Sequence, residues 1–401
     1  MEPLLWLLLP VAAASGWFGA RISARGRGTA GTGNTSSGTH LHCIQGLNYL
    51  LNDQSDKAIN LLIELMDVDE DTVETHLVLG SLFRRRGEVN RAIRIHQNII
   101  ARPNLSAEQK SSALLQLGID YLKAGLLDRA ENILLQLTEP PIRKPEAFRY
   151  LRNLYEQEKE WDKAIHVAER LQRYSEQTQA PYIAHYYCEL AERSLRQRLY
   201  EDAQALVKKA VNTDPDGLRA NLLQGDIMAT LGRGKDAIKS YVVALKKDPY
   251  FSPVIYKHLF DLFRAENKLD EFPDFIRRHS DSNKDAAARF FLVRTFESLG
   301  DHATVESLLH DELNRSEVSP YIIKSYLEMM QGRTDGEINA SFTALSRILD
   351  ARLSTSMACH CTKCGFESNA LFWQCPGCKS WSTVRPYANP VEYSWLSSEV
   401  S

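Results

Sequence analysis

Residues 80–97, GSLFRRRGEVNRAIRIHQ, place a glycine and an alanine twelve positions apart in a strongly helical stretch. Successive alanines of this kind are 34, 38, 34, 39 and 34 residues apart, which is the period of the tetratricopeptide repeat. A chance run of helical hairpins is the alternative, and six alanines at this period disfavour it. The pairs are Gly46 with Ala58, Gly80 with Ala92, Gly118 with Ala130, Ala191 with Ala203, and Gly225 with Ala237, whereas Ala164 has Arg152 in place of the glycine.

Residues at other fixed positions relative to these small-residue and alanine pairs support a repeating unit of two packed helices. The small residue lets the second helix approach closely, and the alanine fills the crossing point. One helix pair buries too little apolar area, so the units must stack into a superhelix with a concave face. We predict an all-α fold of six tetratricopeptide repeats over residues 40–250 and divergent helical repeats over 251–353. The supporting residues are aromatic Tyr49, Phe83, Tyr121 and Tyr155, turn residues Gly87, Gly125 and Gly232, and closing residues Pro215 and Pro249.

The beginning of the chain predicts a membrane anchor. Residues 3–20, PLLWLLLPVAAASGWFGA, carry no charge and as a helix would span about 27 Å, close to the hydrocarbon thickness of a bilayer. Arg21, Arg25 and Arg27 follow, which places the C-terminal side in the cytoplasm. A cleaved signal peptide is the alternative, but its charged leading region is missing. We predict a transmembrane helix over residues 1–20 and a flexible Gly/Ser/Thr-rich tether over 21–39.

Five of the seven cysteines lie between residues 359 and 378. Disulfides are unusual in the cytoplasm, and two C-x-x-C turns supply four thiolates that suit one tetrahedral zinc or iron ion. We predict a rubredoxin-like or zinc-ribbon module over residues 357–387, with metal ligands Cys361, Cys364, Cys375 and Cys378, and a tail over 388–401.

The remaining residues near these turns are assigned simpler roles. Cys359 and His360 are spare ligands by position, although bystander roles are favoured. Cys43 and Cys188 are expected to be small buried side chains. Phe366, Phe372, Trp373 and Trp381 are expected to pack around the metal or against the last helices.

The metal is expected to stabilise the module. Four sulfur ligands leave no open position for water, which argues against hydrolysis, and a module this small needs the folding energy of the metal. Electron transfer stays open if the ion is iron. The chain has no P-loop or nucleophile elbow, and its net charge of -3 gives no basic field for nucleic acid. We predict a binding protein and no enzyme activity.

Repeat geometry identifies a candidate partner surface, because the first helix of each unit faces inward. Inward positions are expected for Arg84 and Arg85, and for Arg149, Asn153 and Glu156 in the fourth unit, with Arg91 and Arg94 on the helix that follows Arg85. Such arginines can clamp the carboxylates of a partner peptide. A solvated basic face near an acidic membrane is an equally open alternative.

Five segments together resemble the lipopolysaccharide assembly protein B family of bacterial inner-membrane proteins. They are LLLPVAAASGW at residues 7–17, GSLFRRRGEVNRAIRIHQ, IAHYYCELA at 183–191, CTKCGF at 361–366 and CPGCKSWSTVRP at 375–386. These segments occur in the same order as in the family, and the resemblance extends over nearly the whole chain. The Gly-rich tether departs from the family pattern, and so does Cys359, which stands where an aromatic residue is usual.

The resemblance implies a function. It implies a single-pass inner-membrane adaptor with its C-terminal domain in the cytoplasm, which links the FtsH protease to the LpxC deacetylase and promotes LpxC degradation. It also implies contacts with other lipopolysaccharide assembly proteins and assigns the four cysteines to a rubredoxin-type module. A homodimer is left open. A general scaffold or chaperone for envelope assembly enzymes is the alternative function.

Overall fold

The computed structural model describes residues 73–280, 285–315, 318, 320–331, 333, 336–355 and 357–387. The chain divides into two compact units, Met1–Leu137 and Thr138–Ser401. The predicted anchor, the tether and the repeat containing Gly46 and Ala58 lie outside the described residues, as does the tail 388–401. Within the described ranges, no helix is both long and apolar enough to cross a membrane.

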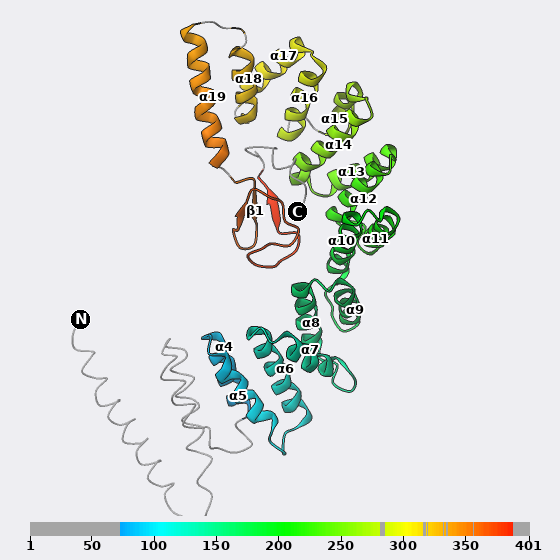
Figure 1. Ribbon diagram of the computed structural model, residues 1–401, viewed down its shortest axis with the longest axis vertical. Helices are drawn as coiled ribbons and strands as arrows, with labels where there is room; N and C mark the ends of the chain where they lie inside the picture. Colours follow the sequence, from blue (N-terminus) through cyan, green and yellow to red (C-terminus); the bar gives the residue numbers. More distant parts are fainter. Residues whose placement is uncertain are drawn as a thin grey trace, which may run out of the picture. The chain divides into compact units, whose positions relative to one another are not determined.

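The described residues of both units form successive helix pairs, as the ribbon in Figure 1 shows, and the second unit also contains a small C-terminal sheet. The described part of the first unit contains α4 (Val73–Arg85), α5 (Val89–Ile100), α6 (Ala107–Lys123) and α7 (Leu127–Thr138). The second unit continues with α8 (Pro145–Glu158), α9 (Trp161–Gln172), α10 (Ala180–Arg196), α11 (Tyr200–Thr213), α12 (Leu218–Thr230) and α13 (Gly234–Lys247). These pairs agree with the predicted all-α repeat architecture.

Further helix pairs follow in the region where the repeat signature fades. They are α14 (Ser252–Ala265), α15 (Phe272–His279), α16 (Ala286–Leu299), α17 (His302–Leu313), α18 (Pro320–Gln331) and α19 (Glu337–Thr355), with short 3-10 helices η3 (Pro249–Phe251) and η4 (Leu269–Glu271). Here a phenylalanine-rich core replaces the close glycine contacts. Phe260, Phe263, Phe272, Phe275 and Phe291 are all buried, so bulky rings separate the helices and the small residues are no longer needed.

The small-residue frame predicted from the sequence is the packing frame of the repeats. The alanines at positions 92, 130, 164, 203 and 237 are all 0% exposed. A Cβ atom on Gly80 would lie 2.3 Å from Nε2 of His96, and one on Gly225 would lie 2.3 Å from the Tyr241 ring. The paired helices therefore approach to a distance that only glycine permits at these positions.

Two departures from the frame have local explanations. Arg152 stands where a glycine is expected, and its guanidinium lies 4.0 Å from the centre of the Tyr182 ring and donates to Oε1 of Gln179 at 2.7 Å. In the turn after α8, Lys159 adopts a φ of 59°, close to the 73° of Gly125 in the corresponding turn after α6. The turn conformation is therefore kept where the glycine is lost.

The C-terminal module is a small antiparallel sheet of order β2-β1-β3. Its strands are β1 (Cys359–Cys361), β2 (Glu367–Ser368) and β3 (Val384–Pro386). Ala358, Cys359, Cys361, Cys375 and Val384 form its buried centre. The sheet brings the first C-x-x-C turn, which begins in β1, close to the second one.

We predict that Gly80→Ala destabilises the first unit more than Gly118→Ala. At Gly80 the new methyl group meets His96, whose Nδ1 is fixed 2.5 Å from Asp120 Oδ2, whereas at Gly118 it would lie 3.1 Å from the Leu134 side chain. Overpacking of this kind costs about 1–3 kcal/mol. Urea unfolding of the full-length protein, followed by circular dichroism, measures both variants. An equal or smaller loss for Gly80→Ala would contradict the packing described here.

Candidate metal centre and the surface it covers

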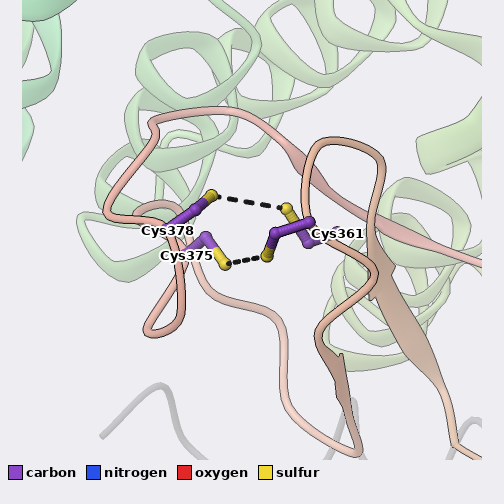
Figure 2. A group of neighbouring side chains, drawn as sticks. Cys361, Cys375 and Cys378 are labelled. Atoms are coloured by element: carbon purple, nitrogen blue, oxygen red, sulfur yellow. Dashed lines mark hydrogen bonds between the residues drawn. The ribbon is translucent and has the colours of Figure 1, made fainter. Parts of the chain in front are cut away.

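Four cysteine sulfurs converge in the C-terminal module. The sulfurs of Cys361 and Cys378 are 3.8 Å apart, and those of Cys364 and Cys375 are 3.7 Å apart. All four lie within 4.8 Å of one another, and Figure 2 shows Cys361, Cys375 and Cys378 pointing toward a common centre. A tetrahedron with bonds of about 2.3 Å has edges of about 3.8 Å. The predicted ligands therefore form a site for one zinc or iron ion.

Two similar turns present these sulfurs. The Gly365 amide donates to the Cys361 carbonyl and the Lys379 amide donates to the Cys375 carbonyl, each at 2.9 Å. Both turns end in the left-handed region, with φ of 74° at Gly365 and 57° at Lys379. Glycine favours this left-handed conformation, yet Lys379 adopts it. The second turn therefore has the same backbone geometry as the first, with lysine in place of glycine.

The surroundings of two ligands favour the thiolate form that binds metal. Burial alone would raise the pKa of the Cys361 thiol, but the Thr383 side chain and the backbone amides of Lys363 and Cys364 outweigh it and lower the pKa to about 6. Hydrogen bonds from the side chain and backbone of Ser380 lower the pKa of Cys378. Cysteine binds metal as a thiolate, so these contacts prepare Cys361 and Cys378 for the ion. The hydrogen bond from the Phe366 backbone would lower the pKa of Cys364, but burial and the sulfurs of the other three ligands outweigh it and raise that pKa to about 12.

Cys359 and His360 lie outside the four-sulfur cluster. Cys359 is 0% exposed in the centre of the module, and burial raises the pKa of its thiol to about 12. The His360 ring stacks on Tyr387 with centroids 4.4 Å apart. Cys188 is buried in α10, as predicted, and Cys43 lies outside the described residues.

Two tryptophans of the module lie against the repeats. Trp381 stacks on His185 of α10 with centroids 4.6 Å apart, and Trp373 stacks on Phe251 of η3 at 5.8 Å. Nε2 of His185 is also 2.7 Å from the Ser382 hydroxyl. These tryptophans were expected near the metal or the last helices, and the structure places them instead on earlier repeats. Phe366 and Phe372 contact each other within the module.

Arg219 of α12 is enclosed where the module meets the repeats. It is 4% exposed, and its guanidinium donates to Glu189 and Glu192 of α10 at 2.7 Å each. The same group lies 5.8 Å from the Trp373 ring centre and 5.7 Å from that of Trp381. A buried cation needs such partners because it has lost its water. The two indole rings supply part of its surroundings.

Glu156 of α8 makes a second polar link. Its carboxylate accepts from the Tyr186 hydroxyl and from Nε2 of Gln374, the latter at 3.0 Å. Burial raises the pKa of this carboxyl, although its hydrogen bonds and the nearby Arg152 oppose the shift. The sequence placed Glu156 on the inward face, but it gave no sign that the module of the same chain covers it.

The predicted partner-binding residues occupy different surroundings. The Arg84 side chain is 13% exposed and is paired with Asp120 at 2.7 Å, while Arg91 is paired with Glu88 at 2.6 Å. Asn153 accepts a hydrogen bond from Arg152 at 3.4 Å. The other three residues, Arg85 on α4, Arg94 on α5 and Arg149 on α8, are exposed.

Comparison with known proteins agrees with both parts of the fold. The family model described as "Rubredoxin metal binding domain" matches residues 360–386, and two described as "Tetratricopeptide repeat" match residues 75–108 and 188–250. Lipopolysaccharide assembly protein B of Escherichia coli strain K12 is 34% identical over 96% of this chain and 98% of its own length. The chain belongs to the lipopolysaccharide assembly protein B family. The Haemophilus influenzae family member is 31% identical, over 97% of this chain and 99% of its own length.

We predict that Cys361→Ala removes the metal and Cys359→Ala does not. Both side chains are buried in β1, but only Cys361 belongs to the four-sulfur cluster. With three sulfurs, a water must take the fourth position, which weakens binding of the ion against a chelator. Metal analysis of the purified full-length variants after dialysis against a chelator should find about one ion per chain in Cys359→Ala and very little in Cys361→Ala. Equal metal content would contradict the ligand assignment.

The contact between module and repeats should weaken in acid. Burial, followed by the charge of Arg219, lowers the pKa of His185 to about 3, whereas a free histidine titrates near about 6.5. When the module is detached from the repeats, His185 therefore binds more protons as the pH falls than it does in the docked state. Neutral His185 stabilises the docked state fully above about pH 6.5, and this stabilisation is lost as the pH falls toward about 3. Glu156, with its raised pKa, acts in the opposite sense.

We predict that the titration of His185 reduces the equilibrium constant for docking by about tenfold between about pH 7 and about pH 5, less the opposing contribution of Glu156. Tryptophan fluorescence of the metal-loaded protein reports the environment of Trp373 and Trp381. His185→Gln, which has the same metal ligands and cannot titrate, should lose most of this dependence. The same pH profile in both proteins would show that His185 does not control the contact.

Proposed function

We propose that this chain is an inner-membrane adaptor in lipopolysaccharide biosynthesis, which brings the LpxC deacetylase to the FtsH protease for degradation. The observation that carries the proposal is the similarity to lipopolysaccharide assembly protein B over 96% of this chain and 98% of the Escherichia coli protein. Such coverage includes the repeats and the metal module together, in the same order.

The structure supports a binding role through the metal site. The four sulfurs fill a tetrahedral coordination sphere and leave no position for a reacting water. The ion therefore supplies folding energy to a module with few buried apolar residues. Stacked repeats provide extended surfaces suited to protein partners.

The proposed anchor over residues 1–20 gives the adaptor its mechanism. Attachment to the inner membrane, with the repeats in the cytoplasm, restricts the chain to the surface on which a membrane protease acts. This restriction raises the effective concentration of both partners without a high affinity for either. Weak contacts would then suffice to promote degradation of the deacetylase.

The half-life of LpxC in bacterial cells that depend on this chain tests the proposal. The intact protein is compared with a deletion of residues 1–20 and with the double variant Cys361→Ser and Cys364→Ser, at equal abundance. We expect LpxC to be degraded more slowly in both. Cys359→Ala, which leaves all four ligands in place, is the matched control and should behave as the intact chain. Equal LpxC turnover in every strain would contradict the adaptor function and favour a general scaffold.

A further inference from the structure

A pocket of about 230 Å³ opens between α4 and α6 in the first unit. Cavities of about 150 Å³ admit a benzene-sized molecule, so this one has room for a leucine or phenylalanine side chain. Val78 on its edge is 50% exposed, which leaves apolar surface open to water. The lining residues are Leu77, Val78, Ser81, Leu82, Arg85 and Gln116.

A buried network fixes the polar wall of this pocket. Asp120 is fully buried and accepts from Arg84 at 2.7 Å, and its other oxygen lies 2.5 Å from Nδ1 of the fully buried His96. The anchored Arg84 then donates to Oε1 of Gln116 at 2.7 Å. The polar wall is therefore preorganised by charged groups that do not themselves line the pocket.

The same network determines which group Gln116 offers to a ligand. Its Oε1 accepts from Arg84 at 2.7 Å and from the Ser81 hydroxyl at 3.2 Å. A guanidinium can only donate, so the oxygen of the amide must face Arg84. The Nε2 amide group of Gln116 is left to donate elsewhere, beside the pocket that the residue lines.

Arg85 gives the pocket a positive charge. Its exposed side chain has no acidic partner within 4.0 Å among the described residues, whereas the neighbouring Arg84 is paired with Asp120 and Arg86 with Glu88. A guanidinium matches a carboxylate through two parallel hydrogen bonds. The charge therefore favours an anionic group at the edge of an apolar pocket.

We propose that this pocket binds an extended segment of a partner protein in which an apolar side chain lies next to a carboxylate. The apolar side chain would fill the space between Leu77, Val78 and Leu82, and burial of that surface would supply affinity. The carboxylate would accept from Arg85 and from Nε2 of Gln116. Arg84 is a positioning residue in this proposal, because it holds Gln116 and does not line the pocket.

This inference deepens the proposed function. It rests on the proposed function only for the identity of the partner protein that supplies the segment. Peptide binding is measured with purified protein, and LpxC turnover is measured in cells. A failure of one is therefore distinguishable from a failure of the other.

The test uses the purified full-length protein in detergent and a fluorescein-labelled peptide of alternating leucine and glutamate. Two further peptides carry lysine in place of glutamate or serine in place of leucine. Fluorescence anisotropy should detect binding of the first peptide and at least about tenfold weaker binding of the others. Arg85→Glu and Val78→Asp should each weaken binding of the first peptide by a similar factor.

Lys110→Glu is the matched control, because Lys110 is exposed on α6, does not line the pocket and lies outside the predicted partner surface. It makes the same charge change and should leave the affinity unchanged. The proposal is overturned if the leucine–glutamate peptide does not bind, if the lysine peptide binds with the same affinity, or if Lys110→Glu and Arg85→Glu have equal effects. A loss in Arg85→Glu of binding to anionic phosphatidylglycerol vesicles, with peptide affinity unchanged, would also overturn it.

Discussion

The packing of the second unit depends on the groups that surround the buried positive charge of Arg219. Removing a guanidinium from water costs several kcal/mol unless partners surround it. Glu189 and Glu192 of α10 provide two short ion pairs, and the rings of Trp373 and Trp381 flank the group. Both rings belong to the metal module and lie on either side of the Cys375–Cys378 turn. The metal module thus supplies part of the surroundings that keep the Arg219 side chain out of water.

This arrangement connects the metal to the repeats. The ion folds a module with a small apolar centre, and the folded module presents its tryptophans to α10, α12 and η3. His185 stacks on one of them and Glu156 accepts from Gln374. Residues on the inward helices of these repeats are therefore occupied by the chain itself. The pocket between α4 and α6, by contrast, lies on helices of the first unit and keeps an exposed cation at its edge.

Local patterns were sufficient to predict the repeats and the metal ligands. The glycine and alanine that mark each helix crossing lie within about one repeat length of each other in sequence. The two C-x-x-C turns are short enough for their spacing alone to identify the four ligands. The docked position of the module could not be predicted in this way. His185 and Ser382 are 197 residues apart and Glu156 and Gln374 are 218 apart, so no local period connects them. Arg84 shows a related limit, because sequence position indicates an inward side chain but not its pairing with Asp120.

Hydrogen exchange of the full-length protein before and after metal chelation tests most directly whether metal binding stabilises the repeats. If the module covers Arg219 only when metal is bound, chelation should increase backbone exchange in α10 and α12 as well as in residues 357–387, and should leave α5 of the first unit unchanged. Faster exchange confined to residues 357–387, with α10 and α12 fully protected, would contradict this coupling.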